Sequence, residues 1–173
     1  TPLTLGMMRA KLSAKDRERV DSHAIKAGEH VDAGPFDVEF FRVNHSIPDG
    51  VGLAIRTPCG MVVHSGDFKF DYTPVIDQPA DLGRLAELGK EGVLALLSDS
   101  TNSESTGFTP SERSVQPALD TLFHEAPGRI IVTTFASHLP RIQQVLWLAE
   151  QHGRKVGVAG RSMVDNIRIA SEL

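Results

Sequence analysis

The order of apolar and amphipathic stretches after residue 110 restricts the possible folds more than any other feature of this sequence. Residues 128–137 and 155–160 are apolar runs of strand length, and each is followed by a helical pattern, over residues 139–152 and from residue 162 onward. Strands that alternate with helices run parallel and are joined by right-handed crossovers. This part of the chain is therefore predicted to be α/β, with parallel strands at residues 130–136 and 155–160.

Three further strands are predicted in the first half of the chain, over residues 36–43, 51–57 and 61–68. Alternation in the first of them places Phe36, Val38 and Phe40 on one face, which we expect to be buried. The other two flank the turn sequence Pro58-Cys59-Gly60 and are expected to form a hairpin.

A domain boundary is predicted between residues 100 and 110. The apolar run at 93–99 is typical of a strand buried on both faces. The next eleven residues are rich in Ser and Thr, contain Gly and Pro, and show no apolar period. We therefore expect one domain over residues 1–106 and a second over residues 107–173.

The second domain is predicted to open with a helix. Thr109 and Glu112 have the spacing of a capping box, with Thr109 as N-cap, and the helix should run to about Glu125. Pro117 is expected to strain the middle of this helix or to divide it.

Composition excludes several classes of protein. No apolar run approaches the roughly 18 residues of a membrane span, and a single cysteine cannot form an internal disulfide, which is consistent with a cytoplasmic protein. Residues 1–106 carry 11 Lys and Arg against 16 Asp and Glu, a net of −5, and residues 107–173 carry 7 against 6, a net of +1, which together give −4. The chain thus lacks the basic excess of a protein that holds nucleic acid by phosphate contacts alone.

Two polar residues are predicted to meet at one end of the hairpin. His45 lies in a loop after an apolar strand, and Asp67 directly follows MVVHSG, residues 61–66, near the end of the next predicted hairpin strand. The hairpin brings Val51 and Asp67 to the same end, and the loop can fold His45 to within about 6 Å of Asp67. An imidazole and a carboxylate suit a Zn²⁺ or Mn²⁺ site, and a carboxylate can bridge two ions. The alternative is a turn histidine beside a strand-end cap.

Asp99, Ser137 and His138 occupy comparable positions after apolar runs. Asp99 is either a carboxylate at the rim of an α/β sheet, where sites gather, or the acceptor of an Asx turn. Ser137 and His138 precede a predicted helix, whose N-terminal N–H groups could bind phosphate. The alternative there is that Ser137 only caps the helix.

Several longer stretches are similar to one enzyme family. VNHSIPDGVGLAIRTPCG, HSGDFKFDYTPV, LLSDSTNSESTGFTPSERSV and GRKVGVAGRSM closely resemble bacterial ribonuclease J sequences. This family belongs to the β-CASP branch of the metallo-β-lactamase superfamily. The resemblance implies an α/β fold in which the second half of a metallo-β-lactamase-like αββα domain is followed by the start of a β-CASP domain.

The resemblance also implies a function. Family members are ribonucleases with 5′-to-3′ exonuclease and endonuclease activity, acting in the cytoplasm as homo-oligomers on RNA that is preferentially 5′-monophosphorylated. They use two divalent metal ions, Zn²⁺ or Mn²⁺. By this resemblance His45 and Asp67 are metal ligands, Asp67 bridges the ions and is catalytic, and Asp99 is catalytic by organising the site. Ser137 and His138 are expected to contact the substrate.

The sequence also departs from the family. The main metal motif, His-x-His-x-Asp-His, does not occur in these 173 residues, and His138 stands where members commonly have Asn. We therefore expect a segment of about a third of such an enzyme, inactive when isolated. Alternatives are a non-catalytic fragment that binds RNA or protein, and a superfamily hydrolase of small phosphoesters. A third alternative is a receiver domain that is phosphorylated on Asp99. Such a domain also needs an acidic pair at an earlier strand end and a lysine at a later one, and the sequence has neither in the required order.

Overall fold

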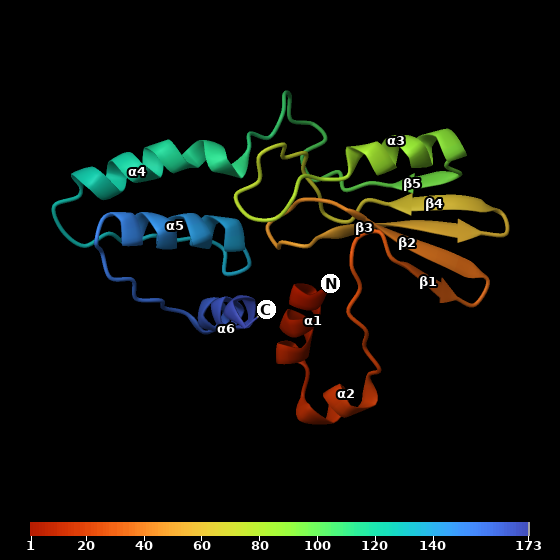
Figure 1. Cartoon of the computed structure of the whole chain (residues 1–173), viewed down its shortest axis with the longest axis horizontal. Helices are drawn as coiled ribbons and strands as arrows, with labels where there is room; N and C mark the ends of the chain where they lie inside the picture. Colours follow the sequence, from red (N-terminus) through yellow and green to blue (C-terminus); the bar gives the residue numbers. More distant parts are fainter. Residues whose placement is uncertain (173) are drawn as a thin grey trace.

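The computed structural model describes residues 1–172, which form a mixed α/β structure (Figure 1). Its strands are β1 (His30–Ala33), β2 (Phe36–Arg42), β3 (Val51–Thr57), β4 (Gly60–His64) and β5 (Ala95–Leu97). Its helices are α1 (Pro2–Lys11), α2 (Ala14–Arg19), α3 (Leu82–Glu91), the 3₁₀ helix η1 (Glu112–Val115), α4 (Gln116–Glu125), α5 (Leu139–Gln151) and α6 (Arg161–Ser171). No helix within residues 1–172 has the length and hydropathy to cross a bilayer.

The five strands form one sheet in chain order. Neighbours from β1 to β4 are antiparallel, and β5 runs parallel to β4. The predicted hairpin is confirmed, because β3 and β4 pair from Thr57–Gly60 to Leu53–His64. Thr57 stabilises this two-residue turn by donating its hydroxyl to the carbonyl of Gly60 at 2.8 Å.

One face of the sheet is buried beneath α3. Phe41 and Val63 belong to a cluster that Leu88 of α3 completes. Phe41 pairs with Gly52, where an added Cβ would lie 2.3 Å from the Phe41 ring, so only glycine fits beneath it. The face predicted from Phe36, Val38 and Phe40 is therefore wrong: the odd-numbered residues of β2 point into the core, and Phe36 is exposed.

The predicted burial of residues 93–99 on both faces is also wrong in this structure. Leu96 and Leu97 of β5 pair with β4 but remain exposed, with half or more of their surface open. A continuous apolar run indicates the strand but not what covers it. Within residues 1–172, β5 is an edge strand with β4 as its one neighbour.

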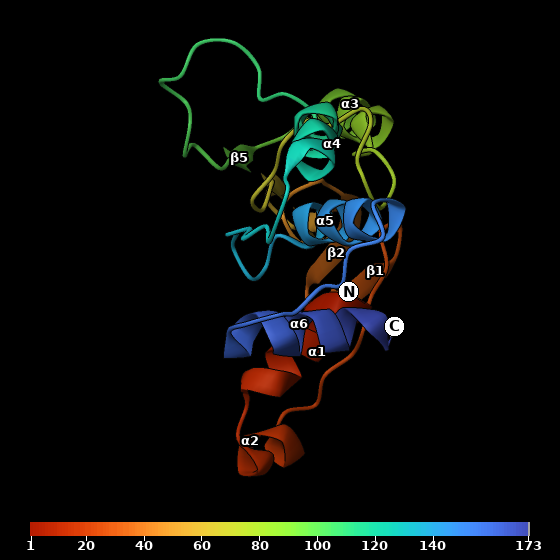
Figure 2. The ribbon, with the colours of Figure 1, turned by 90° about the vertical axis from the view of Figure 1, so that its left-hand side faces the viewer.

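The remaining helices form two smaller clusters. Phe123 of α4 packs on Leu148 of α5. Leu3 and Met7 of α1 pack with Ile169 of α6, so the first and last helices lie against each other (Figure 2). This contact joins the two ends of the described chain.

The two strands predicted at residues 130–136 and 155–160 are absent from the sheet. A strand requires a hydrogen-bonded neighbour, and neither segment pairs with another strand within residues 1–172. Their side chains remain open: Ile131 and Phe135 are each more than 80% exposed (84% and 81%). The apolar pattern predicts a segment suited to pairing, whereas the partner is a property of the whole fold.

The start of the second half also differs in detail from the prediction. Ser111, not Thr109, is the N-cap, and its hydroxyl accepts from the amide of Arg113. The predicted helix is divided next to Pro117, because η1 ends at Val115 and α4 starts at Gln116 with Pro117 in its first turn. A missing N–H has no cost in the first turn, so the proline does not strain α4 itself. The predicted end at Glu125 is confirmed. Residues 98–110 form the loop expected there, which extends away from the helices in Figure 2.

Candidate active site

The loop with His45 lies beside the segment that follows β4. Asn44 and Lys69 form an isolated antiparallel bridge, in which the Lys69 amide donates to the Asn44 carbonyl at 2.8 Å. His45 is next to this bridge on one segment, and Asp67 is two residues from it on the other. Both side chains are exposed at the same end of the sheet. The two segments therefore meet, while the approach of the His45 and Asp67 side chains to within about 6 Å stays a prediction.

Asp99 lies at this same end. Its amide donates to the hydroxyl of Ser65 at 2.9 Å, and its carboxylate accepts from the hydroxyl of Thr101 at 2.6 Å and from the Thr101 amide at 3.0 Å. The Thr101 hydroxyl is the main cause that lowers the pKa of Asp99, with smaller contributions from the Thr101 and Phe68 amides and the charge of His45. Asp99 is thus an ionised Asx-turn acceptor whose charge also acts on His45.

The donor types at this rim suit a Zn²⁺ or Mn²⁺ site, but their number does not complete one. An imidazole and carboxylates are the ligands that these ions take. Within residues 1–172, however, no three His, Cys, Asp or Glu side chains are close enough together to hold an ion. The metal-binding roles of His45 and Asp67 therefore stay predictions.

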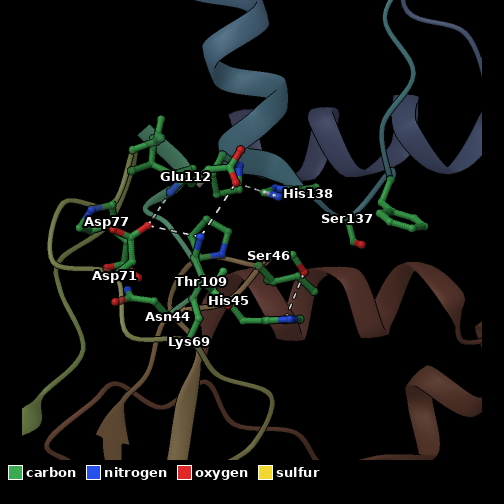
Figure 3. Close-up of a pocket in the computed structure, with 17 residues that line it drawn as sticks. Asn44, His45, Ser46, Lys69, Asp71, Asp77, Thr109, Glu112, Ser137 and His138 are labelled. Atoms are coloured by element: carbon green, nitrogen blue, oxygen red, sulfur yellow. Dashed lines mark hydrogen bonds and ion pairs between the residues drawn. The ribbon is translucent and has the colours of Figure 1, made fainter. Parts of the chain in front are cut away.

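A cavity of about 360 Å³ lies between this end of the sheet and the start of α5 (Figure 3). His45, Ser137 and His138 line it together, although they come from distant parts of the sequence. Asp67 and Asp99 lie at the same end of the sheet but do not line the cavity. The structure thus joins three of the five predicted site residues in one cavity.

The N-terminus of α5 does not offer free amides to a phosphate. His138 is the N-cap, and its carbonyl accepts from the amides of Arg141 and Ile142, both at 3.1 Å. The amide of Leu139 donates to the Ser137 carbonyl at 2.9 Å, and Pro140 has no N–H. The prediction of phosphate binding by this helix N-terminus is therefore wrong. Ser137 and His138 can contact a ligand only through other groups.

Sequence reasoning missed a network of charged residues in the cavity wall. Asp71 is 3% exposed and accepts from the amides of Thr73 at 3.0 Å and Glu112 at 2.9 Å. Burial opposes ionisation of Asp71, but hydrogen bonds from Ser111 and these amides, with the charge of Lys69, outweigh it and lower the pKa. The alternation of charged and aromatic residues in DFKFD, residues 67–71, is the signal that could have identified Lys69 and Asp71.

His138 also faces this network. Its Nε2 atom is 3.3 Å from a carboxylate oxygen of Glu112. Burial lowers the pKa of His138, and Arg141 and Lys69 act in the same direction, while Glu112 opposes them. The imidazole is therefore neutral at physiological pH and can both donate and accept a hydrogen bond.

Comparison with known proteins places the chain in a family. The model of the ribonuclease J β-CASP domain matches residues 127–173. The ribonuclease J of Thermus thermophilus is 47% identical over 99% of this chain, that of Synechocystis is 50% identical over 99%, and ribonuclease J2 of Bacillus subtilis is 42% identical over 100%. The chain belongs to the ribonuclease J family. It spans 30%, 27% and 31% of these relatives, respectively.

A solved structure supports the fold independently. A crystal structure described as a protein of unknown function from Enterococcus faecalis matches 99% of this chain and 41% of its own, with a TM-score of 0.62 and 17% sequence identity. At that identity the match concerns the fold alone. The ribonuclease J resemblance and the α/β class are confirmed, whereas the boundary between residues 106 and 107 stays a prediction.

Proposed function

We propose that this chain is part of a metal-dependent ribonuclease that hydrolyses RNA phosphodiester bonds, as a 5′-to-3′ exonuclease and endonuclease. The observation that carries the proposal is the meeting of His45, Asp99 and the segment after Asp67 at one end of the sheet, within a chain similar to ribonuclease J along its whole length. The preferred substrate is 5′-monophosphorylated RNA. The full-length protein is proposed to be a cytoplasmic homo-oligomer.

His45 and Asp67 would be ligands of two divalent ions, Zn²⁺ or Mn²⁺, with the other ligands supplied from outside these 173 residues. Such ions lower the pKa of a bound water and stabilise charge on the phosphate. Asp99 acts on this site indirectly. Its carboxylate is held in place by Thr101 and keeps a negative charge near His45, so it helps to organise this end of the sheet for a cation.

Ser137 and His138 are proposed to contact the RNA across the cavity. Because the imidazole of His138 is neutral, it can exchange hydrogen bonds with a base edge or a ribose hydroxyl. The ionisable residues of the wall other than histidine are one cation, Lys69, and three carboxylates, Asp71, Asp77 and Glu112. This charge balance gives the wall no general attraction for phosphate.

The experiment that tests this proposal follows the cleavage of a 3′-labelled, 5′-monophosphorylated RNA with Mn²⁺, using the longest natural form of the protein. We expect mononucleotide release that a chelator stops, and at least a hundredfold loss in His45→Ala. His23→Ala is the matched control, because His23 is an exposed histidine whose partner in an exposed ion pair is Asp21. Unchanged cleavage in His45→Ala would contradict the assignment.

The isolated 173-residue chain is proposed to be inactive as a nuclease. The observation that favours this is the lack of any group of three metal-binding side chains within residues 1–172. In isolation the chain would then act at most as a non-catalytic fragment that binds RNA or protein.

A further inference from the structure

Glu112 connects the two sides of the cavity. It is 8% exposed and opens η1, directly after the long loop. Its amide donates to Asp71, and its carboxylate accepts from the guanidinium of Arg141 and from the amide nitrogen of Gln144, the latter at 3.3 Å. Arg141 and Gln144 are three residues apart on one face of α5. One residue thus binds both the segment after β4 and the first turns of α5.

The same carboxylate also faces the cavity itself. Its Oε2 atom is 3.3 Å from Nε2 of His138 and 3.9 Å from Nζ of Lys69, and Lys69 pairs with Asp71 at 3.3 Å (Figure 3). Lys69 is two residues after Asp67, and His138 is directly after Ser137. Glu112 therefore touches both the segment proposed to bind metal and the segment proposed to contact RNA.

The charged side chains around Glu112 balance one another. Two carboxylates, of Asp71 and Glu112, face two cations, of Lys69 and Arg141, so that no buried charge lacks a partner. Gln144 is 0% exposed, and its Oε1 atom has no hydrogen-bond partner within residues 1–172. Its amide nitrogen donates to both the backbone carbonyl and the carboxylate of Glu112, each at 3.3 Å, so this buried side chain ties α5 to Glu112 at two points.

We propose that Glu112 is a positioning residue, which fixes the start of α5 against residues 67–73 and so sets the distance between the metal side and the RNA side of the cavity. The consequence for catalysis rests on the proposed function. The contact between the two segments does not, because it follows from the atoms already described. Loss of the carboxylate should loosen both segments without unfolding the sheet.

Hydrogen exchange in the longest natural form of the protein tests the contact. In Glu112→Gln, we expect amides in residues 138–142 to exchange about tenfold faster or more, because the charge-assisted bond to Arg141 is lost. Amides in residues 67–73 should exchange faster by a smaller factor, because Lys69 loses its ion pair with the carboxylate while the Glu112 amide still donates to Asp71. Amides of β3 should keep their rates. Glu150→Gln, an exposed glutamate on the same helix α5, is the control and should leave all these rates unchanged. Unchanged exchange in Glu112→Gln, or a uniform increase that includes β3, would overturn the proposal.

RNA cleavage by the same variants tests the consequence. Because the metal ligands are retained, Glu112→Gln should raise KM for RNA about fivefold or more and lower kcat less. A merely structural role would lower the active fraction and hence apparent kcat, leaving KM unchanged, and that outcome would overturn the positioning role. If the unmodified protein cleaves no RNA, the proposed function fails, and the exchange result alone decides whether Glu112 joins the two segments.

Discussion

The buried carboxylate of Glu39 leads to the most quantitative prediction. Glu39 lies in β2, 4% exposed, and accepts hydrogen bonds from Arg84 of α3, which donates from Nη2 at 2.9 Å. Nη1 of Arg56 is 2.8 Å from the same carboxylate. Hydrogen bonds from Arg84 are the main cause that lowers the pKa of Glu39 from 4.5 to about 2, with Arg56 acting in the same direction and burial opposing them.

This shift converts into a pH-dependent contribution to stability. A folded-state pKa of about 2 against 4.5 in the unfolded chain corresponds to at most about 3 kcal/mol of unfolding free energy. Arg84 and Arg56 are 25% and 31% exposed, so solvent screening reduces the expected value to about 2 kcal/mol. Because the folded pKa is lowered, the contribution is complete above pH 4.5 and is lost as the pH falls toward 2.

Urea unfolding, followed by circular dichroism between pH 2.5 and pH 7, measures this contribution. Glu39→Gln should lower the unfolding free energy by about 2 kcal/mol at pH 7, and the difference from the unmodified chain should shrink as the pH approaches 2.5. Glu87→Gln is the matched control, since Glu87 pairs with the same Arg84 at 2.8 Å but is 64% exposed. It should cost less than about 0.5 kcal/mol. Equal effects of both variants, or a difference that acid does not reduce, would refute the reasoning.

Three further predictions concern other parts of the molecule. Asp99→Asn should keep the metal content of the longest natural form but lower RNA turnover at least tenfold, as measured by elemental analysis and single-turnover cleavage, and loss of the metal would contradict its indirect role. The guanidinium of Arg154 donates to the carbonyls of Phe123, Ala126 and Gly128 around the end of α4. Arg154→Ala should therefore lower the unfolding free energy by about 2 kcal/mol in a denaturant titration, and an effect below about 0.5 kcal/mol would refute this capping role. The isolated 173-residue chain should bind Zn²⁺ far more weakly than the roughly 10–16 kcal/mol of complete structural sites, and calorimetry that detects such tight binding would show that these residues hold a complete site.

The sequence predicted the local elements better than their surroundings. The hairpin at residues 57–60, the helix ending at Glu125 and the helix beginning at Leu139 follow from turn residues, caps and apolar spacing, which act within a few residues. The burial of β5 and the pairing of residues 130–136 depend on distant neighbours, which local pattern does not specify. Phe36 illustrates this, because alternation gave its strand but the wrong buried face.

The candidate site divides in the same way. His45, Asp67 and Asp99 were found because each follows an apolar strand, and strand order alone brings such positions to one end of a sheet. Glu112 was expected only as a helix-capping residue, because its partners lie 26 to 43 positions away in the sequence, from His138 to Lys69. Its true contacts, with Lys69 and Arg141, require the packing of α5 on the loop after β4.

Metal content and RNA cleavage in Asp67→Ala, measured together on the longest natural form of the protein, test whether this end of the sheet is the catalytic centre. We expect the unmodified protein to carry Zn²⁺ or Mn²⁺ and to release mononucleotides from 5′-monophosphorylated RNA. Asp67→Ala should lose bound metal and all detectable cleavage, since a group proposed to hold both ions is removed. Full metal occupancy with normal turnover in Asp67→Ala would contradict the claim that this end of the sheet is the catalytic centre.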